Sequence, residues 1–554
     1  MDFETGRDHR FRLRPEERLA REQGTVIKDW GGRLPIALVY PNSYYLGMSN
    51  LGIHALYRFL NNDESVVAER VFWEPIRQAQ GRPIRQAQGR PIRQAQGRPI
   101  RQAQGRPDRR DKRLGPLSVE SQRPLPDFAV LAFSVSYELD YFNIAPILKS
   151  GGIPVFAAER DERHPLIIAG GPCVTANPMP LSPFFDCLCI GEAESILPKL
   201  LPALSGGIGV PRDDLLKSLA RVPGVYVPKY PAPVQRQWTK DLDEFPVTSA
   251  VLTPDTEFGD MYLMEVERGC KWRCRFCLVG TAFSPMRYRS LGKLLEMAKE
   301  GLKYRKRLGL VGPAVSDHPQ LEQLLVSLRE MGAQFAVSSL RVSSLSDKAL
   351  EEIARGGAET ITIAPEAGSQ RLREAIRKGV CEEDILGAMG KIADLNVKQV
   401  KLYFMIGLPS ETDDDIEEII NLTLKCKEMF ERKRSGTRLT LNIAPFVPKA
   451  GTSFQRYPAA PVKTLDERMA RLKDRLMPQG IKLKLESSLW SEVQAVLSRG
   501  DAKIAGVLAD VEKPSLAAWR GAVAKHGLDV DFYAHQEWGK EEKVAWGNIE
   551  LKKE

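Results

Sequence analysis

The stretch MYLMEVERGCKWRCRFCLVG, residues 261–280, joins a short apolar segment to three cysteines spaced C-x3-C-x2-C. The apolar segment 261–267 predicts a buried β-strand. Cys270, Cys274 and Cys277 follow it at once, so we expect the three thiols on the loop after its carboxyl end. The chain has eight cysteines, and clustered cysteines in a reducing compartment indicate metal or redox chemistry rather than disulfides.

Strands and helices alternate after this stretch. Five further apolar segments lie near residues 309, 334, 359, 397 and 438. Helical patterns such as DKALEEIARGG separate them. Six strand–helix units predict a partial (β/α)6 barrel over residues 256–455, whose active face is formed by the loops after the strands. The cysteine loop belongs to that face.

The same α/β alternation precedes the barrel, over residues 35–205. Apolar runs including PIALVY, DFAVLAFSVS, PVFAA, PLIIAGG and FFDCLCIG predict strands of a Rossmann-like domain with a parallel sheet covered on both faces. The fold class is therefore α/β throughout. We assign the remaining segments as an N-terminal extension, a connector and a small C-terminal extension, at residues 1–34, 206–255 and 456–554.

Residues 75–106 repeat PIRQAQGR four times and contribute eight arginines and no acid. The net charge of the whole chain is +9, so the remainder is close to neutral. Proline and glycine in every unit prevent a continuous helix, which predicts a disordered insertion in the Rossmann-like domain. The alternative is an arginine-rich arm that contacts RNA. A nearly neutral remainder argues against a nucleic-acid partner.

The first residues, MDFETGRDHRFRLRPEERLAREQG, are charged where a signal peptide has an apolar core. No apolar run approaches the roughly 18 to 20 residues of a membrane span. We therefore expect a cytoplasmic protein with no membrane partner.

The three cysteines lack a nearby fourth ligand, since the next histidine is His318 and the next cysteine is Cys381. A structural zinc site needs four ligands. A four-iron cluster held by three thiolates leaves one iron open to a substrate. Phe276, beside the last cysteine, suits a cluster shielded from water. The spacing therefore favours a catalytic [4Fe-4S] cluster.

This motif, after the first strand of a partial barrel, resembles that of the radical S-adenosylmethionine superfamily. The stretches ETITIAPEAGSQRLREAIRKG and LYFMIGLPSETDDDIEE are similar to later barrel segments of its subgroup with an N-terminal cobalamin-binding domain. SVSYELDYFNIAPILKSGGIPV, IIAGGPCVTANPMPL and CIGEAE resemble that domain. The resemblance implies that S-adenosylmethionine binds the open iron and is cleaved to a 5′-deoxyadenosyl radical. It also implies an electron donor of the flavodoxin or ferredoxin type.

Further residues are expected at the S-adenosylmethionine site. Ser339 and Arg341 follow the third barrel strand and Glu366 the fourth, which places them on the active face. Arg341 is expected to pair with the methionyl carboxylate and Glu366 with ribose hydroxyls; ion pairs between loops are the alternative. Gly407 matches a family position near adenine, and Phe276 lies beside the cluster.

The loop after the second barrel strand departs from the family. It reads Val311-Gly312-Pro313-Ala314, where the family often has Gly-Gly-Glu to receive the amino group. Amino recognition must therefore come from backbone carbonyls or from elsewhere. Asp317 and His318 are nearby candidates.

The loops after the Rossmann-like strands predict a cobalamin crevice. Its expected residues are Ser134, Val135, Ser136, Gly170, Gly171, Pro172, Gly191 and Glu192. Small residues there would let backbone approach the corrin or its nucleotide tail. PNSYYLGMSNLG, after the first strand, contains no Asp-x-His-x-x-Gly, so any cobalamin is expected base-off and without a histidine ligand. The alternative is a domain that kept the fold and lost the ligand.

The leading hypothesis is cobalamin-dependent methylation of an unactivated carbon, with the substrate unknown. The alternatives are a cobalamin-independent radical enzyme and a methylthiotransferase acting on tRNA. The latter needs a second cluster, for which Cys173, Cys187 and Cys189 are a poor match. An alternative of another class is a non-catalytic iron–sulfur or RNA-binding protein.

Overall fold

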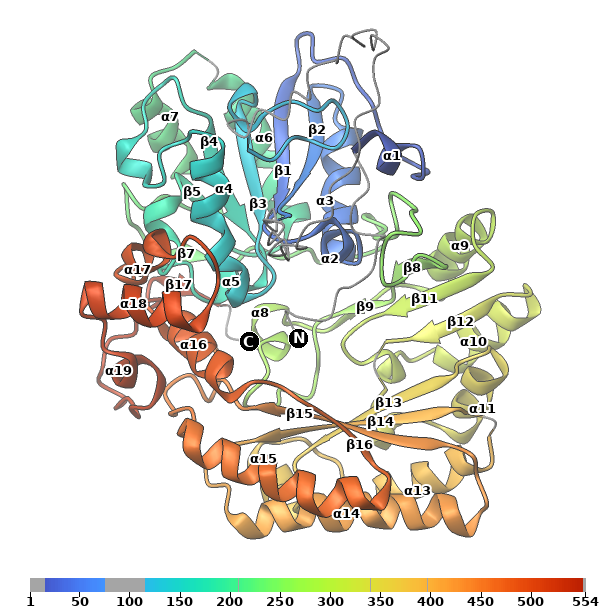
Figure 1. The fold of residues 1–554 in the computed structure, drawn as a ribbon. Helices are drawn as coiled ribbons and strands as arrows, with labels where there is room; N and C mark the ends of the chain where they lie inside the picture. Colours follow the sequence, from blue (N-terminus) through green and yellow to red (C-terminus); the bar gives the residue numbers. More distant parts are fainter. Residues whose placement is uncertain (1–14, 75–114, 208, 339, 396, 552–554) are drawn as a thin grey trace, which may run out of the picture.

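The computed structural model describes residues 15–74, 115–207, 209–338, 340–395 and 397–551. The octapeptide repeat and Ser339 lie outside the described residues. An N-terminal sheet with its helices lies above an open barrel, and helices of the C-terminal region lie beside both (Figure 1). The predicted α/β fold class is confirmed.

The N-terminal sheet has the strand order β2-β1-β3-β4-β5-β6, and β6 alone runs antiparallel. Its strands are β1 (Leu34–Tyr40), β2 (Val66–Phe72), β3 (Val130–Ser134), β4 (Leu166–Gly170), β5 (Cys187–Cys189) and β6 (Val225–Tyr226). The predicted strand PVFAA is wrong: that segment leads into the short 3-10 helix η4 (Ala157–Glu159).

The sequence did not predict strand β2, because Glu69 and Arg70 interrupt its apolar run. Both side chains are buried. Arg70 makes ion pairs of 2.6 Å with both Glu22 and Glu120, which compensates its charge inside the core. Trp30 donates to Glu69 at 2.8 Å. Long-range pairing thus converts a polar segment into a buried strand.

Helices cover both faces of the N-terminal sheet, as the doubly buried strands predicted. One face packs against α3 (Leu51–Asn62) and α6 (Ala193–Gly206). The other packs against α4 (Ile144–Ser150) and α5 (Pro172–Ala176). The described part of the N-terminal extension contains α1 (Pro15–Leu19), and α2 (Tyr44–Met48) follows β1.

The barrel consists of two parallel sheets, β12-β11-β8 and β13-β14-β15-β16. An isolated parallel bridge between Leu340 and Ile363 connects them. The six predicted strands are β8 (Met261–Glu265), β11 (Arg307–Val311), β12 (Gln334–Val337), β13 (Thr360–Glu366), β14 (Gln399–Ile406) and β15 (Arg438–Pro445). Among the described residues no pairing joins β8 to β16, which leaves the barrel open.

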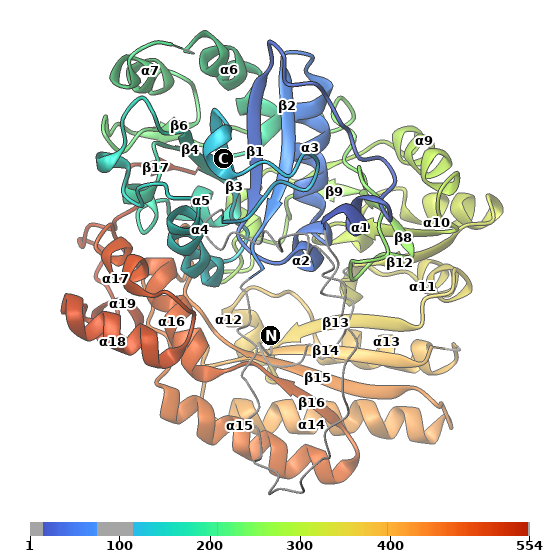
Figure 2. The same cartoon turned by 45° about the horizontal axis from the view of Figure 1, so that its top comes forward.

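Helices line the outside of the barrel, where their apolar faces meet alternate residues of the strands. They are α9 (Leu291–Leu302), α10 (Leu321–Glu330), α11 (Asp347–Arg355), α13 (Glu382–Ala393) and α14 (Asp413–Arg432). The short helix α12 (Gln370–Ala375) instead packs into the apolar cluster at the strand ends, through Leu372. In Figure 2, α13 and α14 lie on the outer side of the β13–β16 sheet together with α15 (Val462–Leu476).

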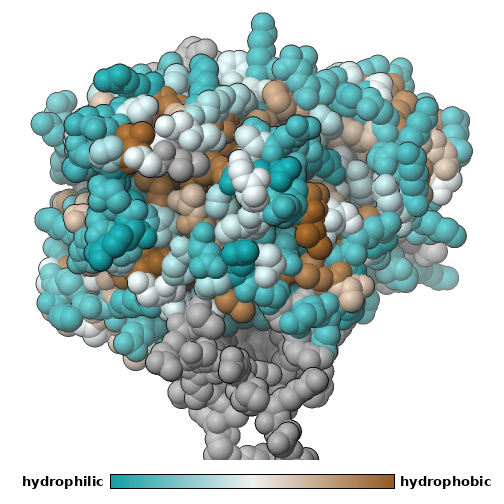
Figure 3. All heavy atoms as spheres, turned by 90° about the horizontal axis from the view of Figure 1, so that it is seen from above, coloured by the Kyte–Doolittle hydropathy of each residue, from teal (hydrophilic) through white to brown (hydrophobic). Residues whose placement is uncertain are grey.

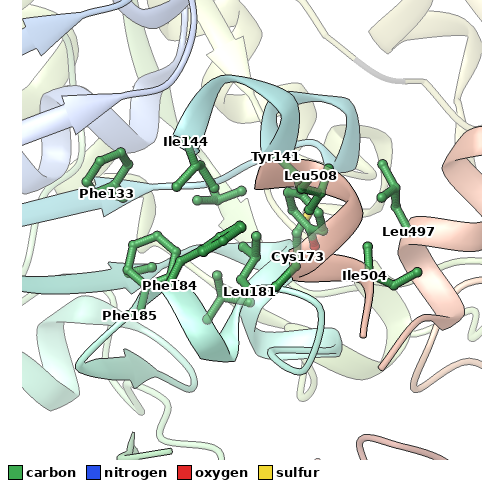
Figure 4. Close-up of a cluster of buried hydrophobic side chains, with 14 of the residues drawn as sticks. Phe133, Tyr141, Ile144, Cys173, Leu181, Phe184, Phe185, Leu497, Ile504 and Leu508 are labelled. Atoms are coloured by element: carbon green, nitrogen blue, oxygen red, sulfur yellow. The ribbon is translucent and has the colours of Figure 1, made fainter. Parts of the chain in front are cut away.

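The C-terminal region completes both domains. Strand β16 (Lys482–Leu485) adds a seventh parallel strand beside β15. Helices α16 (Ser488–Arg499) and α17 (Ile504–Asp510) pack into the N-terminal domain, where Leu497, Ile504 and Leu508 meet Tyr141 and Cys173 (Figure 4). α18 (Leu516–His526) and α19 (Val530–Ala534) follow.

Three tryptophans of this region, Trp519, Trp538 and Trp546, are buried core residues. The connector is more structured than predicted. It contains helix α7 (Arg212–Leu219) and strand β7 (Val234–Gln235), which pairs with β17 (Ile549–Glu550) near the end of the chain. The C-terminal region therefore fixes the connector and the two domains in one arrangement.

No helix in the described ranges combines the length and apolar character needed to cross a bilayer. Figure 3 shows the molecule from above, relative to Figure 1. The surface on this face is mainly hydrophilic, and its apolar side chains gather in small patches.

Candidate functional site: a cysteine loop facing an interdomain cavity

The cysteine loop begins where the first barrel strand ends. Strand β9 (Glu267–Arg268) pairs with β10 (Arg287–Tyr288), and Gly269 turns the chain into the loop with φ +85°. A Cβ added at Gly269 would lie 2.5 Å from the Phe283 carbonyl oxygen, so only glycine fits this approach. Helix α8 (Val279–Ala282) starts directly after Cys277. The backbone thus holds the loop on the predicted active face.

Backbone amides support the thiolate state of two cysteines. Burial raises the pKa of Cys277 to about 11, while hydrogen bonds from the amides of Val279 and Gly280 act in the opposite direction. Burial likewise raises the pKa of Cys270, and the amide of Trp272 partly offsets it. Such amide donors stabilise a deprotonated sulfur bound to metal.

The donor set fits an iron–sulfur cluster. Cys270, Cys274 and Cys277 are free thiols on one partly exposed loop. Within the described ranges, no three His, Cys, Asp or Glu side chains lie close enough to share one metal ion. A four-iron cluster does not require this, because its cysteines bind separate iron atoms.

Trp272 anchors the loop, which the sequence did not predict. Its indole nitrogen donates to Asp317 Oδ2 at 2.5 Å. The guanidinium of Arg341 lies over its ring, with Cζ 3.7 Å from the centroid. On the other side of the loop, Phe276 packs into a small apolar cluster with Leu408 and Phe446 at the strand ends. The loop is therefore held from both sides of the barrel mouth.

Arg341 is buried near Cys270 and Cys274. It donates to the Gly379 carbonyl and to the Ser343 hydroxyl, each at 3.0 Å. Burial lowers the pKa of Arg341, and the nearby Cys274 thiol acts in the opposite direction. Glu366 ends strand β13 with φ +70° and forms a 3.0 Å ion pair with Lys378. In this structure Glu366 therefore forms an ion pair, which was the alternative to ribose binding. Its expected contact with ribose hydroxyls stays a prediction.

Gly407 has a structural reason to be glycine. Its φ is +79°, and a Cβ there would lie 2.8 Å from both Ala460 Cβ and Leu465 Cδ2. His318 also has a structural role, since Nε2 contacts the Arg289 carbonyl at 2.9 Å and Nδ1 accepts from the Gln320 amide at 3.1 Å. The expected contact of Gly407 with adenine stays a prediction.

Glu267 stands out in the loop region, although no sequence motif singled it out. Its side chain is buried, and Oε1 accepts from the Ala314 amide at 2.5 Å. Oε2 is buried without a hydrogen-bond partner. Burial raises the pKa of Glu267 to about 8, against the smaller opposing effect of the Ala314 amide.

A cavity of about 650 Å³ lies between the N-terminal sheet and the first barrel strands. Its walls come from the carboxyl ends of β3 and β4, from α3 and α6, and from Glu267, Gly269 and the α8 segment after the third cysteine. Of the residues predicted for cobalamin, seven line it: Ser134, Ser136, Gly170, Gly171, Pro172, Gly191 and Glu192. Val135 is fully buried and is not among the lining residues.

The glycines of this wall have different roles from those expected. A Cβ at Gly171 would lie 2.4 Å from the Val135 carbonyl oxygen, and one at Gly191 would lie 2.1 Å from the Gln237 carbonyl oxygen. Close packing of neighbouring backbone, together with positive φ, therefore requires glycine at both. Gly170 differs, since its nearest neighbour would be Cys189 Cβ at 3.5 Å. Of these three glycines, Gly170 is the one that close packing does not require, so its missing side chain leaves space in the cavity.

Glu192 joins the two domains. It accepts from Arg287 Nη2 at 2.6 Å and from Arg268 Nη1 at 2.8 Å, and the Thr239 amide donates to it at 3.1 Å. Burial acts to raise the pKa of Glu192, but the arginines outweigh it and lower that pKa below its usual value. The carboxylate is thus engaged by protein donors at the cavity wall.

The other N-terminal cysteines do not form a common site. Cys173 lies in the core on one face of the sheet, against Tyr141. Cys187 and Cys189 belong to the core on the opposite face. The sheet itself separates the thiols, which agrees with their poor match to a second cluster.

Comparisons with known proteins identify the family. Residues 98–228 match a model of the N-terminal region of radical SAM proteins, and residues 264–423 match the radical SAM superfamily. An uncharacterised protein of Methanocaldococcus jannaschii is 30% identical over 529 residues, covering 93% of this chain and 98% of that protein. The chain therefore belongs to the radical S-adenosylmethionine superfamily, whose members use a [4Fe-4S] cluster and S-adenosylmethionine.

More distant similarities extend over parts of the chain. An uncharacterised methyltransferase of Pyrococcus horikoshii is 24% identical over 54% of this chain and 64% of that protein. A tRNA-2-methylthio-N(6)-dimethylallyladenosine synthase of Petrotoga mobilis is 26% identical over 34% of this chain and 44% of its own length. Among solved structures, the cobalamin-dependent radical enzyme OxsB aligns with a TM-score of 0.47 and 12% identity, covering 90% of this chain and 72% of that one.

Proposed function

We propose that this radical SAM enzyme transfers a methyl group to an unactivated carbon, with cobalamin bound in the interdomain cavity. The cavity carries the proposal: its walls bring the carboxyl end of the N-terminal sheet and the segment after the third cysteine into one space. Ligand sites of open parallel sheets lie at this edge. The similarity to a protein named as a methyltransferase supports the same reaction class.

When bound, the cluster supplies the electron that cleaves S-adenosylmethionine, and cobalamin supplies a methyl group that a carbon-centred radical accepts. The chain's own residues position these groups. Cys270, Cys274 and Cys277 hold the cluster, and Arg341 and Trp272 fix their loop. The apolar cluster around Phe276 limits water at the cluster. A flavodoxin or ferredoxin-type protein is the proposed electron donor.

The lining residues suit a base-off corrinoid. They include apolar side chains of α3 and α6 that could cover a large ring or its tail, such as Leu56, Phe59 and Leu201. No histidine occurs among the residues that line the cavity. His54, the nearby candidate on α3, is buried and already contacts the Met48 carbonyl at 2.9 Å. Bound cobalt should therefore lack a protein nitrogen ligand.

A substitution that fills the cavity tests the proposal. In Gly170→Phe, the ring would project into space that glycine leaves open, whereas Gly436→Phe adds the same ring in an exposed loop with no neighbour within 4 Å. We expect Gly170→Phe to retain iron and lose corrinoid after anaerobic reconstitution with cobalamin, and Gly436→Phe to retain both. Wild-type protein that binds no corrinoid would contradict the proposal and leave a cobalamin-independent radical enzyme.

A further inference from the structure

Glu267 carries a buried carboxylate oxygen without a partner at the edge of the cysteine loop. The side chain is 1% exposed, and only Oε1 is engaged, by the Ala314 amide at 2.5 Å. Oε2 is buried with no hydrogen bond. Leaving a buried polar group unsatisfied is costly, so such a group in a native structure indicates a missing partner.

Neighbouring acids do have cationic partners. Glu265 pairs with Arg289 at 2.5 Å, and Arg268 joins Glu192 and Glu194 at 2.8 Å each. By contrast, no ion pair within the described ranges involves Glu267, although it lies two residues after Glu265 and directly before Arg268. Arg268 and Arg289 thus pair with other carboxylates and not with Glu267. Lys271, the remaining nearby cation, pairs with Asp317 at 3.5 Å, so no described cation contacts Glu267 Oε2.

The loop after β11 makes room for this arrangement. A Cβ at Gly312 would lie 2.7 Å from Glu267 Cγ and 3.1 Å from its Oε1. Glycine at this position therefore permits the buried rotamer. Glu267, Gly312 and Pro313 together line the interdomain cavity. The unpaired carboxylate therefore belongs to a residue of the cavity wall.

We propose that Glu267 receives the positively charged amino group of S-adenosylmethionine, an assignment that rests on the radical chemistry of the proposed function. Two residues separate Glu267 from Cys270, so its carboxylate lies at the start of the cluster loop. The loop Val311-Gly312-Pro313-Ala314 contains no acid of its own. Glu267 supplies from strand β9 the negative charge that this loop lacks, and a carboxylate to ammonium contact is a strong, charge-assisted hydrogen bond.

Glu267→Gln tests the assignment, because it keeps the shape of the side chain and removes its charge. We expect the dissociation constant of S-adenosylmethionine, followed through the electron paramagnetic resonance of the reduced cluster, to rise about 10-fold to 100-fold. Above pH 8, where Glu267 with its pKa of about 8 is ionised, the melting temperature of the cluster-free protein should stay the same or rise, because an unpaired buried charge disappears. A purely structural acid would instead lower it. Glu330→Gln, on the exposed end of α10, is the matched control.

Gly312→Ala gives an independent test, since its Cβ would displace Glu267 without removing the carboxylate. It should weaken S-adenosylmethionine binding while iron content stays at the wild-type level. Unchanged affinity in both variants would overturn the assignment, as would loss of corrinoid with S-adenosylmethionine affinity intact. If wild-type protein binds S-adenosylmethionine but no corrinoid, the methyl-transfer proposal fails and the Glu267 assignment stands. Wild-type protein that binds no S-adenosylmethionine overturns both.

Discussion

Arg341 and Trp272 form a stacked pair at the centre of the site, with the guanidinium carbon 3.7 Å from the indole centroid. One partner comes from the loop after β12 and the other from the cysteine loop. Arg341 also lies near Cys274, whose thiol raises the Arg341 pKa against the lowering effect of burial. The pair therefore links the barrel directly to a proposed cluster ligand.

Removing the indole should loosen the cluster. Trp272→Ala loses both the cation–π contact and the hydrogen bond to Asp317, whereas Trp272→Phe keeps a ring for Arg341. We expect iron release to a ferrous chelator to accelerate about three- to thirtyfold in Trp272→Ala, with Trp272→Phe between it and wild type. Equal release rates in all three proteins would show that the pair does not secure the cluster.

The interdomain ion pairs should make stability depend on pH. The pKa of Glu192 is lowered in the folded protein because its arginine partners outweigh burial. Its stabilising contribution is therefore present above the unfolded-state pKa near 4.5 and is lost as pH falls through the lower folded-state value. Glu192→Gln should lose about 3–5 kcal/mol near pH 7, because buried Arg287 loses its carboxylate partner. Arg268, by contrast, keeps Glu194 and Glu265.

Thermal unfolding between about pH 7 and pH 3 checks this prediction. The melting temperatures of wild type and Glu192→Gln should differ most near neutral pH and converge toward the acid end. A difference that does not change with pH would contradict the role assigned to the charged carboxylate.

Gly407→Ala should destabilise the barrel. The left-handed backbone costs a non-glycine residue about 1–3 kcal/mol, and the new Cβ meets Ala460 and Leu465 at 2.8 Å. Gly292→Ala is the control, because this glycine lies in helix α9 with nothing within 4 Å of an added Cβ, and alanine favours helix. Chemical unfolding should show a lower midpoint for Gly407→Ala and an equal or higher one for Gly292→Ala; equal losses would refute the conformational explanation.

The fold was largely predictable from sequence because its strands are apolar and its helices are periodic. The barrel strands and the cysteine loop follow from local patterns alone. Strand β2 did not, because Arg70 becomes compatible with a core only through Glu22 and Glu120, which lie far away in sequence. The same holds for the site. The cysteine motif can be read from the sequence, whereas the absence of a partner for Glu267 depends on which acids the nearby arginines contact in the folded protein.

The N-terminal cysteines should not contribute iron. Cys173 is separated by the sheet from Cys187 and Cys189. Replacing all three by alanine should leave the iron content unchanged, although cavities left by buried side chains lower thermal stability. Wild-type protein with about eight irons, falling to about four in this variant, would instead support a second cluster, as a methylthiotransferase requires.

Iron content and product formation test the central claim most directly. Anaerobically reconstituted wild-type protein should bind about four irons per chain and, with a strong reductant, convert S-adenosylmethionine to 5′-deoxyadenosine. Alanine at Cys270, Cys274 and Cys277 should abolish both. Wild-type protein that holds zinc and no iron, or a triple variant that still forms 5′-deoxyadenosine, would contradict the account.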